Sequence, residues 1–154
     1  MGLDMYLVGK RYLWSSDGDE DLQAQIAALF PELPSNKRWG KEEVRIQEVR
    51  AELGYWRKAN HIHQWFVENV QGGEDDCGNY YVEREQLQTL VDLCKEVLEN
   101  RGTANEKLPT ASGFFFGSTE YDDYYYQDLE LTISQLEKAI ALPVNWDIEY
   151  HSSW

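Results

Sequence analysis

The chain has 154 residues, enough for one compact domain and too few for two, so we expect residues 1–154 to form a single domain. Its 28 acidic and 14 basic residues give a net charge of −14, and so acidic a surface repels nucleic-acid phosphates. Aromatic residues make up 14% of the chain, which argues against disorder. The composition therefore excludes direct nucleic-acid binding and an unfolded chain.

The opening residues have the alternation of a β-strand. Leu3, Met5 and Leu7 share one face of residues 2–14, which predicts a strand there. The turn residues of "SSDGDED" then break it and supply a helix N-cap. These residues predict a strand that ends in a turn.

A short helix and a polar loop follow. The apolar residues Leu22, Ile26, Leu29 and Phe30 recur with helical spacing, which predicts an amphipathic helix over residues 20–30. Prolines stop this helix. The polar stretch "PSNKRWGKEE" then predicts a loop, and its tryptophan is a candidate contact point or lid.

Residues 44–59 are compatible with two structures. Val44 and Ile46 share one parity, whereas Val49 begins a set with the other parity. A strand with a β-bulge near Glu48 reconciles the two sets, because one extra residue reverses the side that faces the core. We favour extended structure over the later part of this stretch, and a helix is the alternative.

Three helices and a strand complete the pattern. We expect helices over residues 60–70 and 83–100, and a last helix that begins near Thr119 and ends at Pro143. Residues 146–154 alternate as a terminal strand. The two terminal strands should pair with one another or with the middle strand. The pattern predicts an α+β fold in which a small, mostly antiparallel sheet packs against three to four helices.

The first candidate binding segment is "YWRKANHIH". Arg57 and Lys58 place positive charge just before a helix N-terminus, where an anion is favoured. Trp56 could stack on a ring, and His61 lies on one edge of the same helix. The alternative for the two basic residues is neutralisation of nearby carboxylates. For His63 we favour a hydrogen-bonded core histidine.

The second candidate segment is the aromatic and glycine-rich "LPTASGFFFGSTEY". Small and hydroxyl residues there allow close backbone approach and hydrogen bonding to an anion: Ser112, Gly113, Ser118, Thr119 and Tyr121. Three consecutive phenylalanines cannot all face one side of an extended segment, so core packing explains most of these rings but not all. We expect the two segments to meet in one cleft.

The chain carries no recognisable catalytic or cofactor motif. Seven carboxylates form two groups: Glu74, Asp75 and Asp76, then Glu120, Asp122, Asp123 and Asp128. Their spacing matches no calcium loop, and we interpret them as a solvated acidic surface. The two cysteines lack a metal or redox spacing, and no signal peptide or membrane span is evident, so we expect a reduced, cytoplasmic protein with no metal and no cofactor.

Several long segments resemble a family of small proteins of tailed bacteriophages and prophages. They are "MGLDMYL", "GYWRKANHIHQWFVENVQ", "DDCGNYYVEREQL", "LPTASGFFFGSTEYDDYYYQDL" and the closing "SSW". The resemblance covers most of the chain outside residues 13–43. It implies a phage accessory protein that acts in host takeover or counter-defence, and it implies no particular activity.

Three functional hypotheses follow. The first is a binding protein without turnover that sequesters a nucleotide-like or other anionic small molecule in the host cytoplasm. The second is an acidic inhibitor that binds a host defence protein directly, with nucleic-acid mimicry as one way of doing so. The third is a small enzyme with His61 or His63 as base and Asp122 or Asp123 as its partner. All three are compatible with a homo-oligomer, and none involves a membrane.

Overall fold

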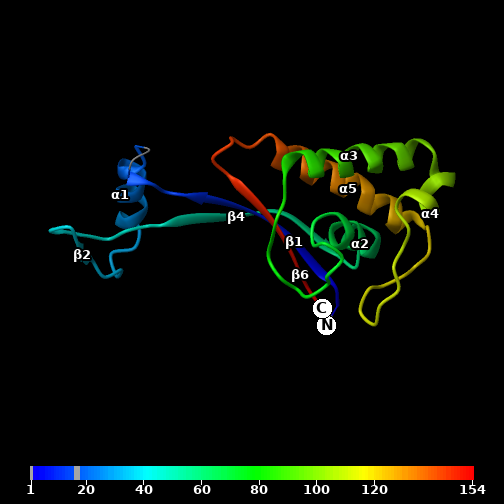
Figure 1. Cartoon of the computed structure of the whole chain (residues 1–154), viewed down its shortest axis with the longest axis horizontal. Helices are drawn as coiled ribbons and strands as arrows, with labels where there is room; N and C mark the ends of the chain where they lie inside the picture. The colour runs from blue at the N-terminus through cyan, green and yellow to red at the C-terminus, as the bar shows by residue number, and fades with distance from the viewer. Residues whose placement is uncertain (1, 16–17) are drawn as a thin grey trace. The chain divides into compact units, whose positions relative to one another are not determined.

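The computed structural model describes residues 2–15 and 18–154, and it has the α+β fold that the sequence predicts (Figure 1). It contains a four-stranded antiparallel sheet. The strand order is β4 (Glu48–Arg57), β1 (Asp4–Tyr12), β6 (Asp147–Ser153) and β5 (Tyr80–Tyr81). The first strand thus pairs with both the middle and the terminal strand.

Contacts between residues group the chain into two compact units. One unit contains the residues up to Gly9 together with Ala51–Trp154, and the other contains Lys10–Arg50. Strands β1 and β4 each continue from the first unit into the second. The first unit holds nearly all of the buried apolar side chains.

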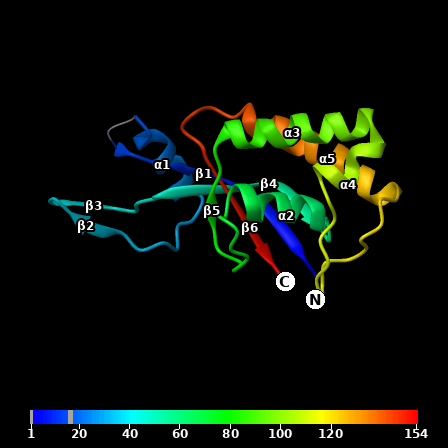
Figure 2. The ribbon, with the colours of Figure 1, turned by 45° about the vertical axis from the view of Figure 1, so that its right-hand side comes forward.

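The helices of the larger unit pack on one face of the sheet. They are α2 (Asn60–Asn69), α3 (Arg84–Glu99), α4 (Ala104–Lys107) and α5 (Asp123–Ile140), with a 3₁₀ turn over Arg101–Thr103. Figures 1 and 2 show α3 and α5 running side by side. This layer covers the buried face of the strands.

Alternation along the strands fixes which face is buried. Met5 and Leu7 of β1 are fully buried, as is Leu3 just before the strand, and the residues between them are half-buried on the opposite face. Trp56 of β4 and Tyr150 of β6 face the same interior. This period of two is the one expected of a sheet with one covered face.

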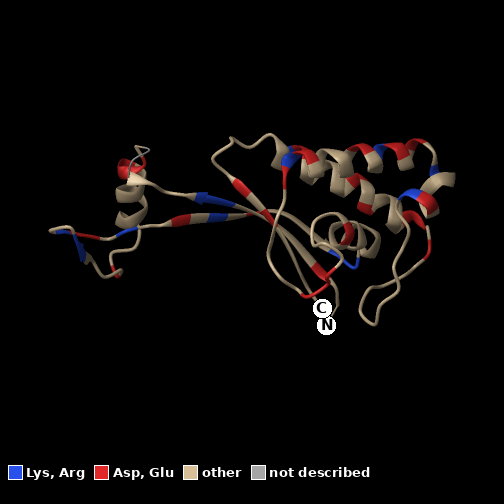
Figure 3. Ribbon diagram, in the orientation of Figure 1, with Lys and Arg blue, Asp and Glu red and all other residues tan. Residues whose placement is uncertain are grey.

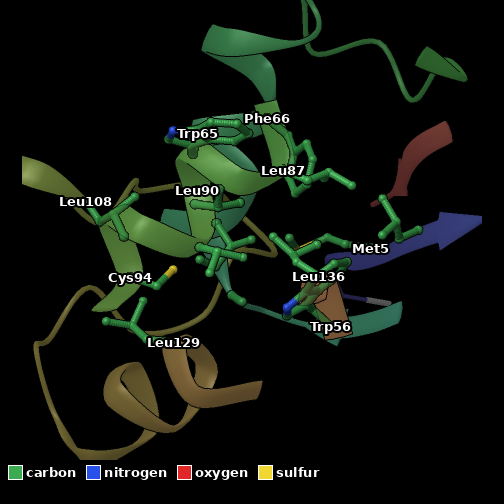
Figure 4. Packing of buried hydrophobic residues seen from close by; sticks show 14 of the residues in the cluster. Met5, Trp56, Trp65, Phe66, Leu87, Leu90, Cys94, Leu108, Leu129 and Leu136 are labelled. Carbon is green, nitrogen blue, oxygen red and sulfur yellow. The ribbon is translucent and has the colours of Figure 1, made fainter. Parts of the chain in front are cut away.

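Aromatic and aliphatic side chains interlock in the core. Phe66 of α2 stacks on Tyr150 of β6, with ring centroids 3.9 Å apart and planes 5° from parallel. Leu90 and Cys94 of α3 pack in the same cluster as Leu129 of α5 (Figure 4). Burial raises the pKa of the Cys94 thiol to about 12, so this cysteine is a packing residue.

Side-chain hydrogen bonds to backbone N–H groups set where α3 and α5 begin. Helix α3 begins with a capping box in which Glu83 and Gln86 each bond the other's backbone N–H, close to the predicted start. Helix α5 begins at Asp123 and not near Thr119, because the Asp122 carboxylate accepts a hydrogen bond from the Tyr125 N–H at 3.1 Å. The three residues before Asp122 belong to the preceding loop.

The smaller unit contains a hairpin where the sequence predicted a loop. Strands β2 (Asn36–Arg38) and β3 (Lys41–Glu43) pair antiparallel. The turn between them places Trp39 and Gly40 at φ values of 48° and 81°, which is the left-handed geometry of a tight hairpin turn. The Trp39 side chain is 89% exposed, and the Arg38 guanidinium lies over its ring.

Helix α1 (Glu20–Ala28) forms where the sequence predicts a helix, but its predicted buried face is wrong. Leu22 and Ile26 are only half-buried, and Leu29 and Phe30 are exposed. The buried side chain is Gln23, whose amide donates to a backbone carbonyl at 3.3 Å. So small a unit offers little core for an apolar helix face to join.

Strand β4 resolves the ambiguity of residues 44–59. The chain is extended from Glu48 to Arg57, as favoured above, and a helix is not formed. Val44 and Ile46 precede the strand, so the change of parity falls outside it and needs no bulge.

Candidate functional site

The junction between β4 and α2 places two cations at the edge of the sheet. β4 ends at Arg57, and Lys58 adopts φ = 60°, which turns the strand directly into the helix. This left-handed conformation costs a non-glycine residue about 1 kcal/mol or more. Two backbone bonds hold it: the Lys58 N–H donates to Leu3 O at 2.8 Å, and the Asn60 N–H donates to Lys58 O at 2.9 Å.

Asn60 fastens a distant loop to this junction. Its side-chain amide donates to Phe116 O at 3.0 Å and to Ser118 O at 2.8 Å. Its carbonyl accepts from the Ala111 N–H at 2.9 Å. Asn60 is 1% exposed, so these bonds satisfy a polar group that would be costly to bury alone. The sequence suggested only a helix start for Asn60 and missed this role.

The loop between α4 and α5 is also bonded to itself. The Thr110 hydroxyl donates to Thr119 O at 2.9 Å, and the Thr110 N–H donates to the Tyr121 hydroxyl at 3.3 Å. The Ser118 hydroxyl accepts from the Glu120 N–H at 3.1 Å and keeps its own hydrogen to donate. The loop is thereby held beside Lys58.

A cavity of about 300 Å³ lies where the loop, the junction and the start of α5 meet. Four of the residues predicted for the cleft line it: Arg57, Lys58, His61 and Ser118. The structure therefore brings together the two segments, residues 55–63 and 108–121, that the sequence expected to meet. Further lining residues include Thr110, Asn60, Gly117 and Tyr125.

Five predicted residues do not line the cavity. Trp56 is buried in the core at 1% exposure, where its indole N–H donates to the Thr132 hydroxyl at 2.8 Å, so in this conformation it cannot stack on a ligand. Tyr121 is half-buried, and its ring packs edge-on against Tyr125, which does line the cavity. The others are exposed elsewhere on the loop: Ser112, Gly113 and Thr119.

Three carboxylates also line the cavity: Glu120, Asp122 and Asp128. In the described part of the chain, none of them forms an ion pair. Burial, and then the neighbouring charge of Asp122, raises the pKa of Asp128 to about 6. Asp128 therefore differs from the fully solvated surface that the sequence suggested.

His61 is a neutral imidazole at the back of the cavity. It is 3% exposed, and loss of hydration lowers its pKa to about 3. Its ring lies against Tyr125, with centroids 4.2 Å apart. Its Nε2 is buried and has no hydrogen-bond partner within residues 2–15 and 18–154.

The two cations differ in how far they are neutralised. The Arg57 guanidinium lies 3.6 Å from the Asp4 carboxylate, with more than half of its side chain exposed. No described residue forms an ion pair with the Lys58 ammonium. Neutralisation by a carboxylate, the alternative weighed for both residues, thus applies to Arg57 and not to Lys58.

His63 is the hydrogen-bonded core histidine that the sequence favoured. It is fully buried, its Nδ1 lies 2.7 Å from the Tyr150 hydroxyl, and its Nε2 lies 3.0 Å from the Asp75 carboxylate. The Trp154 indole N–H donates to the same carboxylate at 3.1 Å. This network ties the end of β6 to the core and does not line the cavity.

A larger hollow, of about 580 Å³, lies within residues 10–50. Its walls are mostly exposed side chains such as Glu20, Lys41 and Trp39. A surface hollow between such side chains holds its shape poorly compared with a cavity backed by the core. We place the candidate site at the smaller cavity, which the buried His61 and Asn60 support.

Comparison with family models, with curated proteins and with solved structures finds no match for this chain. The resemblance to a phage family therefore stays a prediction. No helix in the described ranges has both the length and the apolar character of a membrane span. Nor does any cluster of three or more histidine, cysteine and acidic side chains in those ranges have the arrangement to hold a metal ion.

Proposed function

We propose that this chain is a non-enzymatic binding protein that holds an anionic small molecule, such as a nucleotide, in the cavity beside Lys58. The observation that carries this proposal is the Lys58 ammonium, which forms no ion pair with any described residue and shares a cavity with the Ser118 hydroxyl and the Arg57 guanidinium. A phosphate or carboxylate would accept hydrogen bonds from all three groups, and charge-assisted bonds are the stronger kind.

An aromatic ring is available for the rest of the ligand. Tyr124 lines the cavity and is 76% exposed, so a base or other planar group could stack on it. Tyr124 takes the role that the sequence assigned to the buried Trp56. The volume of about 300 Å³ is at the lower end of small-molecule sites.

The environment of His61 favours binding without turnover. A general base works best with a pKa near the operating pH, whereas burial lowers the pKa of His61 to about 3. No carboxylate in the described ranges hydrogen-bonds to the His61 ring. Without such a partner the imidazole lacks the orienting group of a nucleophile–base pair.

The biological role proposed with this binding is sequestration of a host signal in the cytoplasm of an infected cell. This part depends on the resemblance to phage proteins. It gives the ligand class to test first, namely nucleotides of the kind used in host immune signalling.

Isothermal titration calorimetry tests the proposal with inorganic phosphate and the four nucleoside 5′-monophosphates. We expect at least one to bind, and an Arg57→Ala, Lys58→Ala variant to bind it about 10- to 100-fold more weakly, since a hydrogen bond to a charged group contributes roughly 1.5–3 kcal/mol. A Lys95→Ala, Lys138→Ala variant removes the same charge from α3 and α5 and should bind normally. The proposal would be contradicted if none of these ligands gave a heat of binding, or if both variants bound the ligand equally well.

A second candidate, an acidic inhibitor of a host protein, is favoured by the charge distribution. Outside residues 10–50 the chain has 20 acidic and 7 basic residues. Figure 3 shows acidic residues recurring along α3 and α5. A complex of this kind should form with a basic host protein at low salt and dissociate as salt rises. Pull-downs from host lysate at two salt concentrations check this. Recovery of the same amount of host protein at both concentrations would count against the second candidate.

A further inference from the structure

The cavity beside Lys58 is lined by groups of opposite charge that come from different elements. The β4–α2 junction contributes Lys58 and Arg57, whereas the loop before α5 contributes Glu120 and Asp122 and the second turn of α5 contributes Asp128. In the described ranges, no ion pair joins a cation of this cavity to one of its carboxylates. Both kinds of group therefore present charge to whatever occupies the cavity.

This arrangement disfavours a ligand that is only an anion. A phosphate placed near Lys58 is attracted by two cations, but it also approaches three carboxylates in a partly desolvated site, where like charges repel strongly. A molecule with a cationic nitrogen at its other end would turn that repulsion into attraction. Burial and the charge of Asp122 both disfavour ionisation of Asp128, and a cation beside the two carboxylates would favour it.

A separate observation concerns a polar group in the lining of the same cavity. The Nε2 atom of His61 is buried and has no hydrogen-bond partner among the described residues, and His61 lines this cavity. A buried polar atom without a partner is costly, so native structures contain few of them. A polar group of a ligand that reached this atom would remove that cost.

We propose that the ligand is a small zwitterion, whose anionic group binds Lys58 and Arg57 and whose cationic nitrogen binds the carboxylates of Asp122 and Asp128. Amino acids and aminoalkyl phosphates belong to this class and fit a volume of about 300 Å³. This inference rests on the proposed function, since it keeps the anion beside Lys58 and adds a requirement for a cation beside Asp122 and Asp128.

Three probes of matched length separate the two ideas by calorimetry at neutral pH: 3-aminopropyl phosphate, propyl phosphate and propylamine. We expect 3-aminopropyl phosphate to bind at least 10-fold more tightly than either of the others. An Asp122→Asn, Asp128→Asn variant should lose that preference and bind the two phosphates equally. Asparagine also caps helices well, so this variant keeps the start of α5. A Glu130→Gln, Glu137→Gln variant of the exposed side of α5 is the matched control.

Every other outcome would refute the anion site, the zwitterion or the assignment of its cation to Asp122 and Asp128. Equal binding of the two phosphates to the unmodified protein refutes the zwitterion and leaves the anion site standing. Binding of propylamine as tight as that of 3-aminopropyl phosphate refutes both, because the anion would then contribute nothing. Absence of binding by both phosphates likewise removes both proposals. A preference for the zwitterion that survives the double asparagine substitution, or that the control also loses, refutes the assignment to Asp122 and Asp128.

Discussion

Replacing Asp128 with asparagine should stabilise the protein at neutral pH. Asp128 is half-buried, and its pKa is raised from 3.8 to about 6 by burial and by the nearby Asp122. The folded protein therefore resists ionisation of this carboxyl, whereas the unfolded chain does not. An Asp128→Asn side chain has nearly the same shape and never ionises.

The magnitude and its pH dependence follow from linkage. A shift of about two pKa units corresponds to about 3 kcal/mol, which partial exposure to water reduces to roughly 1–2 kcal/mol. Well below pH 3.8 the carboxyl is protonated in both states, so native and variant proteins should be equally stable with respect to this group. As pH rises from about 4 to about 6, the unfolded chain ionises before the folded protein, so the native protein loses stability relative to the variant; above that range the difference is constant.

Urea unfolding of both proteins at intervals from pH 4 to pH 8 measures this difference directly. At pH 7.5 we expect the free energy of unfolding of the variant to be higher by roughly 1–2 kcal/mol. Thermal unfolding should then give a Tm higher by roughly 2–8 °C, since 1 kcal/mol moves the Tm of a chain of this size by about 2–4 °C. The control is Glu130→Gln, which removes the same charge from an exposed position of α5. A stability difference that does not change between pH 4.5 and pH 7.5, or a variant less stable than the native protein at pH 7.5, would refute the reasoning.

Two further substitutions test the packing around the cavity and the core. Asn60→Ala should lower the free energy of unfolding by about 2–4 kcal/mol, because three backbone groups of the distant loop lose their partner. Asn69→Ala, on the exposed end of α2, is the control and should cost less than about 1 kcal/mol. Denaturant unfolding compares the two variants, and equal losses of stability would contradict the role of Asn60 in holding the loop. Tyr150→Phe should cost about 1–2 kcal/mol, because the buried His63 Nδ1 loses its bond, and Tyr81→Phe, which changes an exposed ring, should lie within about 0.5 kcal/mol of the native protein in the same assay.

The elements that the sequence predicted well are those whose signals are local. Helix α3 combines a continuous apolar stripe with a capping box of neighbouring residues, and its bounds were close to those expected. The hairpin of β2 and β3 was missed because its strands are polar and exposed, and because its turn uses Trp39, a residue type that rarely adopts a positive φ. Strand β5 has two residues, and only its pairing with β6 defines it.

The site shows the same division between local and non-local information. Strand alternation alone could have excluded Trp56, because Gly54 and Trp56 face the interior while Tyr55 and Arg57 face outward. The clamp by Asn60 could not be predicted, because its three bonds reach residues more than 50 positions away. The raised pKa of Asp128 depends on how α5 packs, which no local pattern in the sequence reports.

The left-handed turn at Lys58 has a consequence for how its ammonium is kept in place. A side chain added at Gly117 would begin 3.0 Å from the Lys58 Cβ and 3.4 Å from its carbonyl oxygen, and φ at Gly117 is itself 88°. The position of the Lys58 ammonium thus depends on the absence of a side chain at Gly117, 59 residues further along the chain. An alanine at that distant place would displace the lysine while leaving every charge in the molecule intact, so steric crowding and loss of charge become separable causes of any defect in binding.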